Sequence, residues 1–173
     1  LDLPLPFPRM TYDEAMSRYG VDKPDTRFGL ELADVTSIVR GSGFKLFARA
    51  ELVKAMKVPG GEKLTRKEID DFTEFVKIYG AQGLAWIKIR PDEWQSPIAK
   101  FLSEDERRGI RDALDLQVGD IVFFQAGESA MVNAALGNLR VHLGEHLGLI
   151  PEDAYNFLWV TDFPLFEYDT EEK

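Results

Sequence analysis

The chain has 173 residues, of which 45% are hydrophobic, and its formal net charge is -9. That length suffices for one domain of about 100 to 150 residues with additional segments. The chain contains no cysteine, which excludes disulfides, thiolate metal sites and thiol nucleophiles and favours a reducing, cytoplasmic setting. An acidic chain is atypical of proteins that bind nucleic acid indiscriminately, but it is compatible with a local basic face.

Three prolines interrupt the first eight residues, which is atypical of a signal peptide or a membrane span. Thr11 and Glu14 have capping-box spacing and predict a short helix that ends at Gly20. A turn-rich loop follows, in which Asp22, Lys23, Asp25 and Arg27 are read as ion pairs that brace a surface loop. A second short helix is predicted over residues 33–40, and Gly41-Ser42-Gly43 predicts a hinge.

The next part of the chain mixes strand and helix patterns. Strands are predicted over residues 44–47 and 51–58, followed by a turn at Pro59-Gly60-Gly61. Thr65 and Glu68 form a capping box that begins a helix ended by residue 80.

Residues 84–90 alternate cleanly, with one apolar face and with Trp86, Lys88 and Arg90 on the other, which predicts a strand with one buried face. Further elements are predicted in order: a helix over 103–116 opened by a capping box, a strand over 121–125, a helix over 129–147 capped by Ser129, and a strand over 157–166. The order of elements predicts an α+β fold: a two-layer sandwich whose mixed or mostly antiparallel sheet carries helices on one face.

Several groups of residues could carry chemistry. Lys57, Lys63, Arg66 and Lys67 cluster around the turn, and Lys88 and Arg90 share a strand face with Trp86, so these six cations are the candidates for RNA contact. Solvated surface lysines are the commoner alternative.

Three other patterns have simpler interpretations. His142 and His146 have metal-like spacing, but no third ligand is evident and structural histidines are favoured. Pro59-Gly60-Gly61 lacks the Lys-Ser/Thr of a nucleotide loop and is read as a plain turn. The acidic run at residues 104–106 is read as favourable charge at a helix start.

Three ordered stretches, residues 58–70, 76–88 and 96–102, carry a family resemblance. They resemble the GAD insertion of bacterial aspartyl-tRNA synthetases. The flanks, Phe7 to Ala15 and Phe157 to Pro164, resemble pieces of the class II catalytic domain of the same family. The resemblance implies an N-terminal stub of the catalytic domain over residues 1–42, the GAD insertion over 43–150, and a C-terminal stub over 151–173.

The resemblance also implies a function for the parent enzyme. Aspartate and ATP, with magnesium, give aspartyl-adenylate, and aspartate then passes to the terminal adenosine of its tRNA. The parent is expected to be a homodimer without membrane attachment. The ATP-gripping arginine motifs of the family would lie outside these flanks, so no catalytic, cofactor-binding or metal-binding residue is assigned, and the chain alone is expected to be inactive.

Two alternatives stay open. The chain could be a protein-interaction or purely structural module, or the GAD module of a tRNA-dependent amidotransferase subunit, although the latter would not be expected to carry catalytic-domain flanks. We also expect the end segments, without their sheet neighbours, to dock on the inner domain, to pair between chains or to be poorly ordered.

Overall fold

The computed structural model describes residues 5–166. Its elements are β1 (Arg9–Thr11), α1 (Tyr12–Tyr19), β2 (Leu32–Asp34), α2 (Thr36–Val39), α3 (Lys45–Arg49), β3 (Leu52–Val58), η1 (Gly61–Lys63), α4 (Arg66–Lys77), β4 (Ala85–Ile89), β5 (Trp94–Gln95), η2 (Ala99–Phe101), α5 (Glu104–Leu114), β6 (Ile121–Gly127), α6 (Ser129–His146) and β7 (Trp159–Thr161). Within the described range, no helix is long and apolar enough to cross a membrane.

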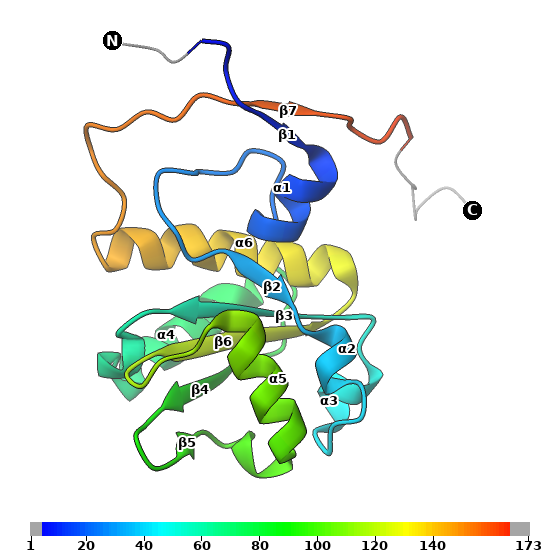
Figure 1. Ribbon diagram of the computed structural model, residues 1–173, viewed down its shortest axis with the longest axis vertical. Coiled ribbons are helices and arrows are strands. Elements are labelled where there is room, and N and C mark those ends of the chain that lie inside the picture. Colours follow the sequence, from blue (N-terminus) through cyan, green and yellow to red (C-terminus); the bar gives the residue numbers. More distant parts are fainter. Residues whose placement is uncertain (1–4, 167–173) are drawn as a thin grey trace.

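The main sheet has five strands in the order β2-β3-β6-β4-β5, and every neighbouring pair is antiparallel (Figure 1). The central strand is β6, which pairs along its whole length with β3 and over Ile121 to Phe124 with β4. Successive residues of β6 point to opposite faces: Phe124 belongs to one apolar cluster and Phe123 to the other. Both faces of the sheet are therefore covered.

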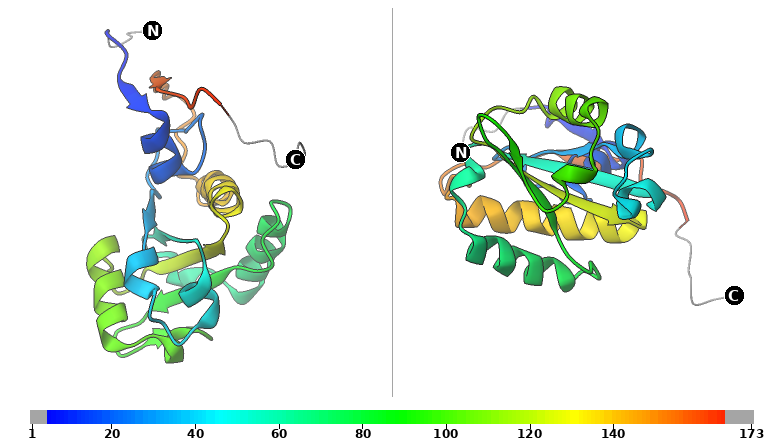
Figure 2. Two further views of the ribbon diagram at one scale, coloured as in Figure 1. Left: turned by 90° about the vertical axis from the view of Figure 1, so that its right-hand side faces the viewer. Right: turned by 90° about the horizontal axis from the view of Figure 1, so that it is seen from below.

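Helices lie on each side of this sheet (Figure 2). The cluster on one face takes side chains from α4 and α6, and the cluster on the other takes them from α2, α3 and α5. The predicted α+β class and antiparallel sheet are confirmed. The prediction that helices occupy one face is wrong, because three short helices bury apolar side chains against the second face. Sequence periodicity shows that a helix has an apolar stripe, but not which face of the sheet receives it.

The capping signals predict the helix starts well. Both capping boxes form, at Thr65 with Glu68 and at Ser103 with Glu106. Gly20 ends α1 in the left-handed conformation, with φ of 72°. Ser129 is not the cap of α6: it is the first helical residue, and the preceding residue makes no side-chain capping bond.

Two short segments are predicted wrongly. Residues 44–47 are not a strand: Phe44 and Phe47 lie one helical turn apart and meet edge to face with ring centroids 4.9 Å apart. A short apolar run of this kind fits the hydrophobic period of a helix as well as that of a strand. The helix predicted over 33–40 is instead β2 followed by α2, because residues 32–34 pair with β3 and the Asp34 carboxylate accepts from the Thr36 amide at 2.8 Å.

The predicted strands at 84–90 and 157–166 also differ in detail. β4 has no solvent face, because Lys88 is only 9% exposed and Trp86 packs against an apolar cluster. The last strand, β7, is only three residues long, and all three residues pair with β1. The backbone turns at Asp162, where φ is 59°.

The two flanks pair with each other. β1 and β7 form a parallel two-stranded sheet at the end of the molecule opposite β5 (Figure 1). Phe7 lies 5.7 Å from Phe157, and Tyr12 lies 5.1 Å from Phe163, between ring centroids. Trp159 remains 59% exposed. The flanks thus find partners in one another, and the boundary at residues 42 and 43 stays a prediction: β2, on its N-terminal side, is part of the main sheet.

The Pro59-Gly60-Gly61 turn is packed tightly. The Gly60 amide donates to the Asp120 carboxylate at 3.2 Å, so an acidic side chain lies where a bound phosphate would need those amides. A Cβ at Gly61 would lie 2.4 Å from Ile121 Cγ2 and 3.1 Å from Val58 Cγ1. These neighbours are buried, β-branched side chains with little freedom to move.

Gly61→Ala should therefore destabilise the protein by about 1 to 3 kcal/mol, since an extra methyl group in a packed core forces displacement of its neighbours. The measurement is the free energy of unfolding in urea. Gly41→Ala is the matched control, because a Cβ there meets nothing within 4 Å. Equal stability of the two variants would contradict the packing at this turn.

Candidate nucleic-acid interface

Three of the six candidate cations gather at the start of α4. Lys63, Arg66 and Lys67 are exposed and lie within five positions of one another, where η1 leads into the helix. The Arg66 guanidinium lies over the Trp86 ring, 5.7 Å from its centroid, and its Nε donates to the Asp70 carboxylate at 2.9 Å. This contact joins the first turn of α4 to β4. Because the bond to Asp70 uses only Nε, the terminal N–H groups of Arg66 can donate to other acceptors.

Arg90 borders this group but is already paired. Its guanidinium contacts the Glu62 carboxylate at 2.9 Å and the Gln95 side-chain oxygen at 3.3 Å. Lys57 is separate from the others, because its ammonium donates to the carbonyl of Asp115 at 2.9 Å, after the end of α5. The structure therefore brings together Lys63, Arg66 and Lys67, with Arg90 at their border.

Lys88 lies in the protein interior. Its ammonium donates to the Leu64 carbonyl, and burial lowers the pKa of Lys88 below its usual range. It holds the segment before α4 against β4 and has no access to an RNA phosphate. The alternating pattern of β4 suggested a solvent face, but α4 and α6 cover that face.

Lys54, which neighbours this group in sequence, is buried as well. Its ammonium donates to the carbonyls of Met16 and Ser17 and to the Asn133 side-chain oxygen, at 2.7, 2.9 and 2.7 Å. Burial lowers the pKa of Lys54 to about 8. The three acceptors satisfy all three N–H groups, and they tie the end of α1 to β3 and α6.

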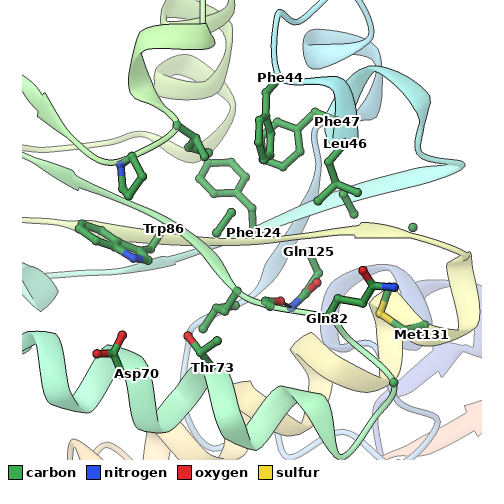
Figure 3. A pocket seen from close by; sticks show the side chains of 18 of the residues that line it. Phe44, Leu46, Phe47, Asp70, Thr73, Gln82, Trp86, Phe124, Gln125 and Met131 are labelled. Carbon is green, nitrogen blue, oxygen red and sulfur yellow. Dashed lines mark hydrogen bonds between the residues drawn. The ribbon is translucent and has the colours of Figure 1, made fainter.

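A cavity of about 600 Å³ adjoins the basic group. Arg66 is among the lining residues. Trp86 comes from β4, Phe44 and Phe47 come from the α3 side, and Gln82 comes from the segment before β4 (Figure 3). Its lining is mainly apolar, with the charged groups of Arg66 and Asp70 and a few amide and hydroxyl groups. Its volume is in the range of small-ligand pockets. Sequence reasoning did not find this cavity, because its walls come from segments distant in the chain.

Both histidines make structural contacts with neighbouring side chains. The His142 ring stacks on Phe75 with centroids 4.3 Å apart, and His146 Nε2 lies 2.9 Å from the Glu68 carboxylate. Phe72 meets both imidazoles edge to face. Between residues 5 and 166, no group of three or more potential ligands is placed to hold a metal ion.

The loop between α1 and β2 has one of the predicted ion pairs, whereas Asp22 and Lys23 make none among residues 5–166. The Asp25 carboxylate and Arg27 guanidinium form an ion pair at 2.7 Å, which holds the pKa of Asp25 below its usual range. Arg27 also reaches the Pro151 carbonyl at 3.3 Å, which links the two flanks. At residues 104–106, the acidic run occupies the first turn of α5 as expected.

Glu68 gives a pH-dependent contribution to stability. Hydrogen bonds from the hydroxyl and amide of Thr65, and then from His146, lower the pKa of Glu68 from 4.5 to about 2. Because the folded protein holds this proton more weakly than the unfolded chain, the contribution is complete above pH 4.5 and is lost as the pH falls towards 2.

Glu68→Gln should therefore be less stable than the wild type above pH 4.5, and the difference should shrink towards pH 2. Unfolding in urea across pH 2 to 7 measures it. Glu74→Gln, on the same helix and 71% exposed, removes only a solvent-exposed ion pair with Lys77 and should stay close to the wild type at every pH. A difference between Glu68→Gln and the wild type that does not vary with pH would contradict this assignment.

Comparison with known proteins identifies the inner part of the chain. The family described as "GAD domain" matches residues 45–136, which is more than half of the chain. The aspartate–tRNA(Asp/Asn) ligases of Nitratidesulfovibrio vulgaris and Oleidesulfovibrio alaskensis are 80% and 69% identical over the entire chain. That of Desulfosudis oleivorans is 55% identical over 98% of it.

The chain spans only 28 to 29% of the length of these relatives. The resemblance read from the sequence, to the GAD insertion of aspartyl-tRNA synthetases, is confirmed by both comparisons. The chain belongs to the GAD domain family.

Proposed function

We propose that the chain is the GAD insertion, with its flanks, of an aspartate–tRNA ligase. The observation that carries this is the 80% identity to such a ligase across all 173 residues, flanks included. The complete enzyme would attach L-aspartate to tRNA through aspartyl-adenylate, using ATP and magnesium. It would work as a cytoplasmic homodimer without membrane attachment. Its catalytic groups would lie in the rest of the catalytic domain, the direct partner of this module.

The path of the chain supports an insertion. β1 and β7 lie side by side, so the chain enters and leaves the module at the same place (Figure 1). Residues 45–136, which match the GAD family, lie between these strands in sequence. This topology lets a module extend from a host domain without interrupting the host's fold.

The module's role in this proposal is to position tRNA through Lys63, Arg66 and Lys67. These cations are exposed at one site, and two of the three, Lys63 and Lys67, have no ion-pair partner among the described residues. Phosphate contacts fix the register of a nucleic acid without reading its sequence. Specificity for the tRNA would then come from the rest of the enzyme.

A second candidate function is protein docking. Phe157, Trp159 and Phe163 are 45 to 59% exposed, and exposed apolar groups of this size mark interaction surfaces. In the ligase proposal these side chains contact the remaining catalytic domain. The named relatives are ligases, which favours a ligase over an amidotransferase subunit.

The test uses the complete ligase with Lys63→Gln and Lys67→Gln together. The KM for tRNA should rise several-fold while ATP–pyrophosphate exchange is unchanged, because two phosphate contacts are lost outside the active site. The salt dependence of tRNA affinity should also decrease, by about 0.7 to 0.9 per contact in the log-log slope.

Lys45→Gln with Lys77→Gln is the matched control, since both lysines lie elsewhere on the surface and the net charge changes equally. The same KM change in both double variants would refute a local contact. The 173-residue chain itself should give no pyrophosphate exchange, and measurable turnover would refute the accessory role.

A further inference from the structure

The cavity beside α4 lies where the pairing of β4 with β6 ends. β4 pairs with β6 only as far as Ala85 and Phe124, whereas β6 continues to Gly127. Within the described part of the chain, β6 has no strand neighbour on that edge over residues 125–127. Residues 82–85 and 124–127 both line the cavity of about 600 Å³. The two strand ends and α4 therefore enclose a space that no main-chain pairing fills.

Gln125 gives this cavity a buried polar group with spare hydrogen-bonding capacity. The residue is 5% exposed, and its Nε2 donates to the Gly83 carbonyl at 2.6 Å, which orients the side-chain amide. Its Oε1 has no hydrogen-bond partner among residues 5–166. The unpaired side-chain atoms that are sealed from solvent belong to other residues: Trp94, Glu106, Arg107 and Arg140. The Oε1 of Gln125 is therefore an acceptor that a ligand in the cavity can reach.

Two aromatic rings at the cavity are partly buried and are held by their neighbours (Figure 3). The Trp86 ring lies under the Arg66 guanidinium, 5.7 Å from its own centroid. The Phe44 ring meets Phe47 and Phe101 at centroid distances of 4.9 and 5.9 Å. Rings that are fixed in advance lose little conformational freedom when a flat ligand stacks against them.

The charges of the lining suit an uncharged ligand. Among the described residues that line the cavity, only Arg66 and Asp70 are charged, and they form an ion pair at 2.9 Å. The cavity therefore carries no net charge, but it borders the basic group of Lys63 and Lys67 at the start of α4. A ligand with a flat, uncharged part and a negatively charged part next to it would match both surfaces.

We propose that the cavity binds the base of an unpaired tRNA nucleotide whose phosphates lie against Lys63 and Lys67. This inference rests on the tRNA-positioning role proposed above, and it names the part of the RNA that the module contacts. Proteins recognise unpaired RNA bases by stacking them on aromatic side chains and arginine planes and by hydrogen bonds to their edges. Trp86 and Phe44 supply the stacking surface, and Gln125 supplies the contact to the base edge.

The test plugs the cavity in the complete ligase. Gly83 lines the cavity, and a Cβ there would meet nothing within 4 Å, so Gly83→Phe adds a bulky side chain without removing a contact. The KM for tRNA should rise about fivefold or more, since base stacking on aromatic side chains is lost. Gly41→Phe is the matched control, because a Cβ there is equally free and Gly41 lies outside the cavity. It should keep the wild-type KM.

Ultraviolet crosslinking of tRNA to the complete ligase tests the contact directly. Mass spectrometry of the digested complex should place the attached nucleotide on Trp86 or Phe44, and this nucleotide should come from an unpaired part of the tRNA. Gly83→Phe should abolish the crosslink, and Gly41→Phe should retain it. The absence of a crosslink to either ring, or an unchanged KM in Gly83→Phe, would overturn the site.

Further outcomes separate this proposal from the ones on which it depends. If Gly83→Phe also loses ATP–pyrophosphate exchange, the cavity holds a side chain of the catalytic domain and the base site is refuted. If Lys63→Gln with Lys67→Gln raises the KM for tRNA and Gly83→Phe does not, tRNA positioning stands and the base site fails. If neither variant changes the KM, both proposals fail. A response to Gly83→Phe alone supports the base site and refutes the phosphate contacts at the two lysines.

Discussion

The fold depends on β6 being buried on both faces and paired on both edges. Its hydrogen bonds to β3 and β4 fix the sheet, and its alternating side chains supply both apolar clusters. Phe123 and Phe124 are each at most 1% exposed, although they point in opposite directions. A strand in this position requires a helical layer on each side, which explains why three short helices cover the face that α4 and α6 leave open.

Burial on both faces also divides the cations into two kinds. Lys54 and Lys88 lie on β3 and β4, and their ammonium groups end on main-chain carbonyls. They fasten neighbouring segments to the sheet. Arg66, Arg108 and Arg111 lie on helices and present their guanidinium groups at the surface or in an open cavity. The cations proposed to contact tRNA, Lys63, Arg66 and Lys67, lie in η1 and the first turn of α4 and not on the strands.

The flanks are held in place by fewer contacts than the main sheet. The parallel pair of β1 and β7 has three residues in each strand, and an isolated two-stranded sheet of this size is marginally stable. Aromatic contacts and the reach of Arg27 to the Pro151 carbonyl add to it, while Trp159 stays exposed. The buried ammonium of Lys54 then couples α1 to the inner sheet, so the orientation of the flank is fixed by a contact with the module it encloses.

The helices with strong end signals, the two capping boxes, the longer strands predicted over residues 51–58 and 121–125, and the GAD resemblance could all be read from the sequence alone. These features depend on neighbours close in the chain, such as Thr65 with Glu68. Long-range packing sets the features that the sequence alone did not show: which face each helix covers, that residues 44–47 belong to a helical turn, that Lys88 is buried, and that Arg66, Trp86 and Gln125 share one cavity. Each of these depends on segments distant in sequence, and the energy of packing and pairing there exceeds the weak preferences of short local patterns.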